Sequence, residues 1–109
     1  MKADDVHALI RTLDRRSHAY HEFIRAEALS VGLAFWPAGS RDDQTPHSED
    51  EVYYVVGGRG RILVGDDDRP VPPGTVIYVA AGVEHHFFDI AADLEVLVFW
   101  APPRHSRRR

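Results

Sequence analysis

Cysteine is absent from the 109 residues of this sequence, which excludes disulfide bonds and thiolate chemistry. The sequence also lacks a long apolar run. Its start, MKADDVHALI, carries acidic residues where a signal peptide needs apolar ones, and the other apolar stretches have the length of single strands. These absences predict a soluble, cytoplasmic protein that does not contact a membrane. At this length we expect a single domain.

Basic residues are scarce outside the C-terminal end. Residues 104–109 hold four of the thirteen Lys and Arg, so residues 1–103 carry nine basic against seventeen acidic side chains, a net charge of -8. An acidic body argues against a nucleic-acid-binding face. We expect one domain over residues 1–103, followed by a disordered basic tail at 104–109.

Helical periodicity is confined to the start of the chain. Val6, Leu9, Ile10 and Leu13 follow the spacing of one helix face, which predicts a helix over residues 4–15 with Asp4 or Asp5 as N-cap. Afterwards the pattern changes to short β-branched and aromatic runs separated by Gly, Pro and Asp turns, which indicates an all-β antiparallel sandwich or barrel. The expected strands cover residues 21–26, 29–36, 52–56, 61–64, 75–79, 85–90 and 94–100.

Two stretches place polar side chains beside expected strands. In residues 39–58, GSRDDQTPHSEDEVYYVVGG, His47 and Glu51 stand four residues apart before a strand, and we expect a turn where that strand ends, at residues 57–60. In residues 74–89, GTVIYVAAGVEHHFFD, a small-residue turn precedes His85 and His86, which open an aromatic strand. Polar ligands at the ends of rigid strands are typical of a pre-organised site.

Together these stretches resemble the two conserved motifs of the cupin superfamily, in its small single-domain form, the cupin type 2 conserved barrel. The resemblance implies a double-stranded β-helix, the jelly-roll-type cupin barrel. Three positions depart from the motifs: Thr45 replaces a His, Ala80 a Pro and Asp89 an Asn. The matching positions are Gly39, His47, Glu51 and Gly58 in the first motif, and Gly74, Gly82 and His85 in the second.

The resemblance implies a site for one divalent transition metal (Fe, Mn, Ni, Co or Zn) held by His47, Glu51 and His85. Two imidazoles and one carboxylate with open positions form the ligand pattern of non-haem Fe(II) oxygenases. Because Thr45 stands where the family has a further His, three outcomes remain open. The site has three ligands, or Gln44 completes it ahead of the weaker candidates Asp43 and His86, or the metal site is lost.

Strand alternation predicts which side chains point inward. If Glu51 and His85 face the interior, Tyr53, Val55, Phe87 and Asp89 face it too, whereas the intervening residues are too apolar to lie in water. That second apolar face indicates cover by the helix or a homodimer interface, and the resemblance to cupins, among which homodimers are common, predicts a homodimer. We expect Glu49 and Asp50 to be solvated. The candidates for a substrate pocket are Tyr53, Phe87, Phe35, Arg25 and Arg61.

Two hypotheses for function follow. The first is a metal-dependent enzyme acting on a small organic substrate, with dioxygenase-like chemistry or, with a redox-inert metal, isomerase, lyase or cyclase chemistry. The second is a non-catalytic small-molecule-binding or sensor module. The sequence identifies no catalytic residue beyond the candidate ligands, because this fold supports many reactions.

Overall fold

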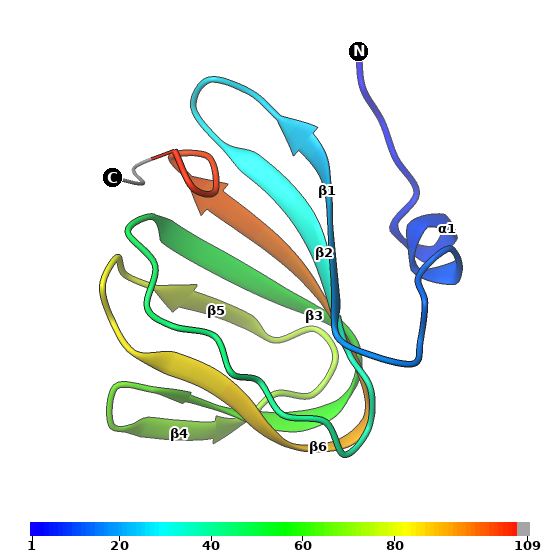
Figure 1. The fold of residues 1–109 in the computed structure, drawn as a ribbon, viewed down its shortest axis with the longest axis vertical. Helices are drawn as coiled ribbons and strands as arrows, with labels where there is room; N and C mark the ends of the chain where they lie inside the picture. Colours follow the sequence, from blue (N-terminus) through cyan, green and yellow to red (C-terminus); the bar gives the residue numbers. More distant parts are fainter. Residues whose placement is uncertain (107–109) are drawn as a thin grey trace.

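Two long, bent strands run through the molecule and carry its other elements (Figure 1). In the computed structural model, which describes residues 1–106, these strands are β3 (Asp50–Val64) and β6 (His85–Ala101). They pair antiparallel from Asp50↔Ala101 to Val64↔His85. The sheet has the order β1-β2-β6-β3-β4, and β5 pairs with the first part of β3. The shorter strands are β1 (Ala19–Arg25), β2 (Ser30–Trp36), β4 (Asp67–Pro70) and β5 (Val76–Val79).

The turn predicted at residues 57–60 is wrong, because β3 bends there and continues. Its pairing with β6 shifts register three times between Val55 and Arg61, as at successive bulges. Gly58 has a φ of 100°, and a Cβ at this position would lie 2.1 Å from the carbonyl oxygen of Asp93 on β6. The two strands predicted at 85–90 and 94–100 are likewise one strand, β6, which bends opposite these glycines.

The predicted alternation of side chains is confirmed for β3 and for most of β6. Glu51, Tyr53 and Val55 are buried, whereas Tyr54 is 40% exposed. His85 and Phe87 are buried as well, but Asp89 is exposed and has a φ of 48°. The prediction that Asp89 points inward is therefore wrong, because the bend in β6 interrupts the alternation at that residue.

Helix α1 (Val6–Arg11) is shorter than the helix predicted over residues 4–15. Asp5 is its N-cap and accepts hydrogen bonds from the backbone N–H groups of His7 and Ala8. The helix ends where the Thr12 hydroxyl bonds back to the Leu9 carbonyl. Figure 1 shows α1 beside β1 and β2, and every residue of β2 is buried. Within residues 1–106, no helix has the length and apolar character needed to cross a membrane, and the cytoplasmic location stays a prediction.

The segment after β6 packs against the barrel. Pro103 is buried, and the backbone N–H of Arg104 donates to the Ser30 hydroxyl at 2.9 Å. Ser30 is 0% exposed, so its hydroxyl needs a partner inside the protein. The prediction of a disordered tail is therefore wrong for Arg104. The tail's last three residues, 107–109, lie outside the described residues.

Candidate metal centre

The structure brings together the three side chains that the sequence motifs single out. His47 lies in the loop before β3, Glu51 on β3 and His85 at the start of β6. One potential ligand atom from each lies within 4.8 Å of the others. The side chains of Glu51 and His85 are each only 1% exposed, and His85 Nε2 lies 2.7 Å from Glu51 Oε1. Such a cluster of two imidazoles and one carboxylate is a donor set that suits a divalent transition metal.

Backbone and carboxylate hydrogen bonds join the two motif segments. The N–H of Gly82 donates to the carbonyl of His47 at 2.7 Å, and the N–H of Ala81 donates to Asp50 Oδ1 at 2.8 Å. Asp50 is exposed, as expected for a solvated carboxylate, but it also holds the turn before His85 next to the start of β3. Glu49 is 2% exposed, so the expectation that it is solvated is wrong. Its carboxylate accepts a hydrogen bond from the Ser48 hydroxyl.

The Glu51 carboxylate fits a metal ligand because it is buried and lacks hydrogen-bond donors. Among the described residues, neither of its oxygens accepts a hydrogen bond, and its one close polar neighbour is His85 Nε2, 2.7 Å from Oε1. Burial of a carboxylate that accepts no hydrogen bond is costly, and a cation would offset that cost. His85 Nδ1 lies 2.9 Å from the Val83 carbonyl, the second contact that orients a metal-binding imidazole and leaves Nε2 for the metal.

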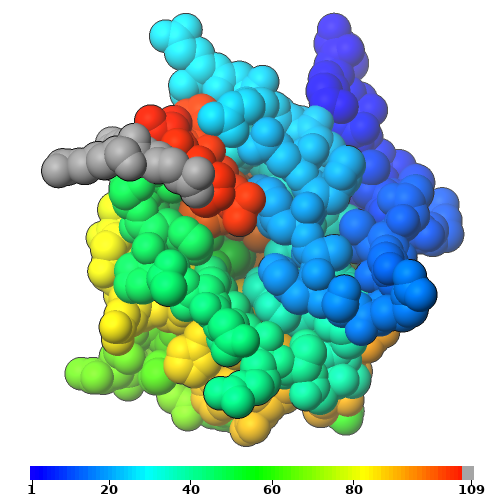
Figure 2. Space-filling model, in the orientation of Figure 1, coloured from blue at the N-terminus to red at the C-terminus, as the bar shows by residue number. Residues whose placement is uncertain are grey.

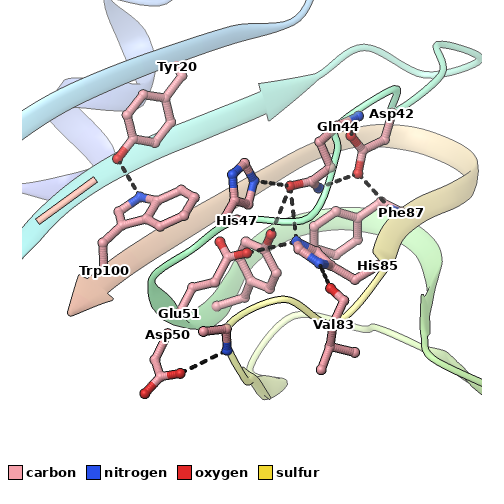
Figure 3. Close-up of polar contacts among 12 residues, drawn as sticks. Tyr20, Asp42, Gln44, His47, Asp50, Glu51, Val83, His85, Phe87 and Trp100 are labelled. Carbon is pink, nitrogen blue, oxygen red and sulfur yellow. Dashed lines mark hydrogen bonds and ion pairs between the residues drawn. The ribbon is translucent and has the colours of Figure 1, made fainter. Parts of the chain in front are cut away.

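Gln44 places a fourth polar group, its amide oxygen, at the centre of the cluster (Figure 3). Its Oε1 lies 3.1 Å from the Nε2 atoms of both His47 and His85, and it accepts a hydrogen bond from the Tyr53 hydroxyl at 3.3 Å. Asp42 fixes this orientation, because its carboxylate accepts from both the side-chain amide and the backbone N–H of Gln44. Thr45, which the motif places at the missing His, is exposed. The Gln44 amide oxygen, and not the Thr45 side chain, therefore faces the two imidazoles.

The buried site alters the pKa values of its side chains. Burial lowers the pKa of His47 and outweighs the opposing effect of Glu51, which favours the neutral imidazole that a metal requires. Burial would also lower the pKa of His85, but the Glu51 carboxylate and the Val83 carbonyl outweigh it, and the pKa is raised. Burial, with the Glu51 charge, raises the pKa of Tyr53 well above its ordinary value, so its hydroxyl remains a hydrogen-bond donor.

A small cavity of about 60 Å³ adjoins the cluster. Figure 2 shows the surface hollowed between the loop before β3, in green, and β1, in blue, with the C-terminal segment in red at one end. The cavity therefore connects the candidate ligands with solvent beside that segment. Its lining comprises His18, Tyr20, Ala34, Trp36, Gln44, His47, Tyr53, Val98, Trp100 and Arg104.

Of the predicted pocket residues, Tyr53 lines this cavity, and Phe87 is buried behind it with ring centroids 5.1 Å apart. The other three predicted residues do not line this cavity. Phe35 alternates with the cavity-lining residues of β2 and lies on the outer face under Arg15. Arg61 pairs with Asp68 at 2.9 Å, while its neighbour Ile62 points inward. Arg25 is exposed and bonds to Glu22 and to the carbonyl of Arg104.

Tyr20, Trp100 and Arg104 are among the cavity residues that sequence reasoning missed. The alternation of Val96, Val98 and Trp100 along the last strand was a usable signal, because all three are buried. Tyr20 lies just before the strand predicted from residue 21. Arg104 follows two prolines at the end of the strand, and no local pattern places it in the site.

The fold and the cluster define a class, a small antiparallel β-barrel with an interior histidine and carboxylate site. Residues 33–101 match the family model described as "Cupin domain", and the chain belongs to this family. It is 51% identical over 85 residues to the uncharacterized protein SCO3923 of Streptomyces coelicolor. The aligned residues cover 78% of this chain and 81% of that protein.

Solved structures share the fold. TT1209 from Thermus thermophilus superposes with a TM-score of 0.80 at 24% identity, over 94% of this chain and 99% of that one. KdgF from Halomonas sp. gives 0.72 at 19% identity, over 78% of both chains. The DMSP lyase DddQ from Ruegeria pomeroyi DSS-3 gives 0.74 at 21% identity, over 85% of this chain and 49% of that one. At these identities the likeness shows the fold alone.

Proposed function

We propose that this protein is a metal-dependent cupin enzyme that acts on a small organic substrate. His47, Glu51 and His85 would hold one divalent transition metal (Fe, Mn, Ni, Co or Zn), with the Gln44 amide oxygen as fourth ligand. The observation that carries this proposal is the buried Glu51 carboxylate, which lies between two imidazoles and accepts no hydrogen bond from residues 1–106. A cation at this point would neutralise the carboxylate.

The chemistry would depend on the metal. A bound metal supplies Lewis-acid polarisation or, if it is iron, the reactivity needed for dioxygenase-like chemistry. The chain's own residues then bind and orient the substrate. Trp36 and Trp100 form apolar walls, and the Tyr53 hydroxyl remains protonated as a hydrogen-bond donor. Isomerase, lyase or cyclase chemistry fits a redox-inert metal. One structural neighbour is named as a DMSP lyase, so this barrel supports lyase chemistry in at least that protein.

A non-catalytic small-molecule-binding or sensor module is the second candidate, and one observation favours it. The Gln44 amide oxygen lies within hydrogen-bond distance of His47, His85 and Tyr53. The imidazoles therefore have a hydrogen-bond partner without a metal. A barrel whose imidazoles bond to Gln44 in place of a metal would bind a small molecule without catalysing a reaction.

We also propose that the protein forms a homodimer through the outer face of β5, β3 and β6. In this face Val52 pairs with Tyr78 and Phe99, and Tyr54 with Val76. Val76 and Tyr78 are 64% and 61% exposed, and Tyr54 and Phe99 about 40%. Helix α1 lies beside β1 and β2 and leaves these residues open (Figure 1). A contiguous exposed apolar face is typical of an interface between protein chains.

Reconstitution tests the two functions against each other. Metal-free protein would be loaded separately with Fe²⁺, Mn²⁺ and Zn²⁺ and incubated with a panel of dicarbonyls, phenols and flavonols, and oxygen uptake and products would be measured. An enzyme gives turnover that depends on the metal and is lost in Glu51→Gln. Saturable binding of a panel compound without turnover under any metal supports the binding module instead.

A further inference from the structure

The guanidinium of Arg104 lies at the cavity, and no anionic partner for it is found among residues 1–106. Among residues 1–106 it forms no ion pair, and its Nε atom is buried without a hydrogen bond. It stacks over the ring of Tyr20, 4.3 Å from the centroid, and lies 5.6 Å from the Trp100 ring. Stacking of this kind supports a cation but leaves its N–H donors unused. A buried donor without an acceptor is costly unless a ligand satisfies it.

The backbone of Arg104 is fixed on both sides, so this position is part of the folded barrel. Its N–H donates to the buried Ser30 hydroxyl at 2.9 Å, and its carbonyl accepts from Arg25 Nη1 at 3.2 Å. Pro103, the preceding residue, is buried. The guanidinium is thereby held over the aromatic rings of the cavity, although Arg104 comes from the end of the chain.

Tyr20 offers a second donor at the same place. Its hydroxyl accepts a hydrogen bond from Trp100 Nε1 at 2.9 Å, and among the described residues its own hydrogen has no acceptor. Burial raises the pKa of Tyr20 to about 12, which keeps this hydrogen in place. Gly32 makes the arrangement possible, because a Cβ there would lie 2.0 Å from the Tyr20 hydroxyl oxygen. Within residues 1–106, Arg104 Nε–H and the Tyr20 hydroxyl hydrogen therefore both lack an acceptor beside one aromatic wall.

The same wall leads to the candidate metal ligands. The His47 ring lies against Trp100, with 4.7 Å between centroids, and both line the cavity together with Arg104. A ligand bound to Arg104 would therefore extend along the Trp100 indole ring to the His47, Glu51 and His85 cluster. At about 60 Å³ the cavity accepts only a few heavy atoms, far fewer than the drug-sized ligands that occupy about 300 to 1,000 Å³.

We propose that Arg104 and the Tyr20 hydroxyl form a carboxylate subsite, and that the ligand of this cavity is a small organic carboxylate whose other end reaches the His47, Glu51 and His85 cluster. The metal-contacting half of this inference rests on the proposed function, whereas the Arg104 half does not. The planar guanidinium fork matches a carboxylate in two parallel hydrogen bonds.

Malonate, a dicarboxylate with three carbons, is the probe, and its neutral analogue malonamide is the chemical control. Binding to Zn²⁺-loaded and to chelator-treated protein would be followed by calorimetry and by the fluorescence of Trp36 and Trp100. In Arg104→Met the side chain still covers the rings without a charge. We expect it to bind malonate about 10- to 100-fold more weakly than wild type, the loss expected for charge-assisted hydrogen bonds. Its zinc content should remain unchanged.

Arg16→Met is the matched control, because the Arg16 side chain is 89% exposed, carries the same charge and, within residues 1–106, bonds to Asp14 alone. Equal malonate affinity in Arg104→Met and Arg16→Met, or malonamide binding as tightly as malonate, overturns the subsite. If wild type binds no zinc but the chelator-treated protein still binds malonate in an Arg104-dependent manner, the proposed metal function fails and the subsite stands. If zinc binds and Arg104 has no effect, the subsite alone fails.

Discussion

At the residue scale, the candidate site depends on the side chain of Gln44, which the cupin motif does not include. Asp42 accepts hydrogen bonds from the backbone and the side-chain amide of Gln44, and also from the backbone N–H of Phe87 on β6 at 2.8 Å. One carboxylate thus positions the loop, the strand and the amide oxygen. If Gln44 is the fourth ligand, Asp42 is the residue that keeps its oxygen turned to the imidazoles.

Substitutions at the two adjacent loop positions separate their roles. Gln44→Ala removes the amide oxygen, and we expect zinc affinity to fall roughly 10-fold, a modest loss because three ligands remain. Thr45→His should leave the affinity unchanged, because Thr45 is exposed. A competition titration with a chromophoric chelator measures both. If Thr45→His tightens zinc binding while Gln44→Ala has no effect, the motif alignment describes the loop better than this structure does.

The sequence was sufficient to single out His47, Glu51 and His85, because all three fit the spacing of the cupin motifs and lie at or near the ends of expected strands. It was not sufficient to choose between Thr45 and Gln44, since that choice depends on the path of an irregular loop without alternation. Arg104 was out of reach for a different reason. A hydrogen bond to Ser30, 74 positions earlier in the chain, holds it in place, and such a contact leaves no local signal.

At the element scale, the bends in β3 and β6 turn a flat pairing into a barrel wall. The glycines at residues 57–60 predict a turn, because in sequence a glycine-rich turn looks the same as a glycine-rich bend within a strand. Only the partner strand distinguishes the two cases. The backbone of β6 at Asp93 and Leu94 approaches Gly58 so closely that no side chain fits. The presence of the N-terminal helix, the central residues of most strands and the inward parity of Glu51 and Tyr53 needed no such partner information and were predicted, whereas β4 was not.

The bend gives a prediction for stability. Gly58→Ala would place a Cβ 2.1 Å from a carbonyl oxygen at a φ of 100°, and we expect a loss of about 3 kcal/mol in the free energy of unfolding. Gly65→Ala is the matched control, because Gly65 also has a positive φ, of 57°, but open space around it. Its cost should be only about 1 kcal/mol. Urea unfolding measures the free energy of unfolding of both variants. Equal losses would contradict the claim that the backbone of β6 leaves no room for a side chain at Gly58.

At the scale of the whole molecule, the barrel buries one face of its sheet around the candidate site and leaves part of the other face apolar. Glu51, Tyr53 and Val55 point inward, and their neighbours in β3 point to the outer face with Val76 and Tyr78. The second apolar face was predicted from the alternation of β3, which is a local signal. The chain's own sequence does not say which surface covers this face, because that depends on how copies of the protein associate. The homodimer remains a proposal.

The outer face gives a prediction for the oligomeric state. Tyr78→Lys places a charge within the apolar face, and we expect it to convert a dimer into a monomer in sedimentation equilibrium while the fold is retained. Leu29→Lys is the control, because Leu29 is also exposed, at 41%, but lies in the hairpin between β1 and β2. A wild-type protein that is monomeric at high concentration, or a dimer insensitive to Tyr78→Lys, contradicts this interface.

Metal content tests the central claim most directly. Wild type, His47→Ala, His85→Ala and the control His86→Ala would be purified without chelator, and bound metals would be measured by mass spectrometry, with circular dichroism to confirm folding. We expect about one equivalent of Fe, Mn, Ni, Co or Zn in wild type and His86→Ala, and almost none in the other two folded variants. Wild type that contains no metal even after reconstitution, or equal metal in all four proteins, would contradict the assignment of His47, Glu51 and His85 as a metal site.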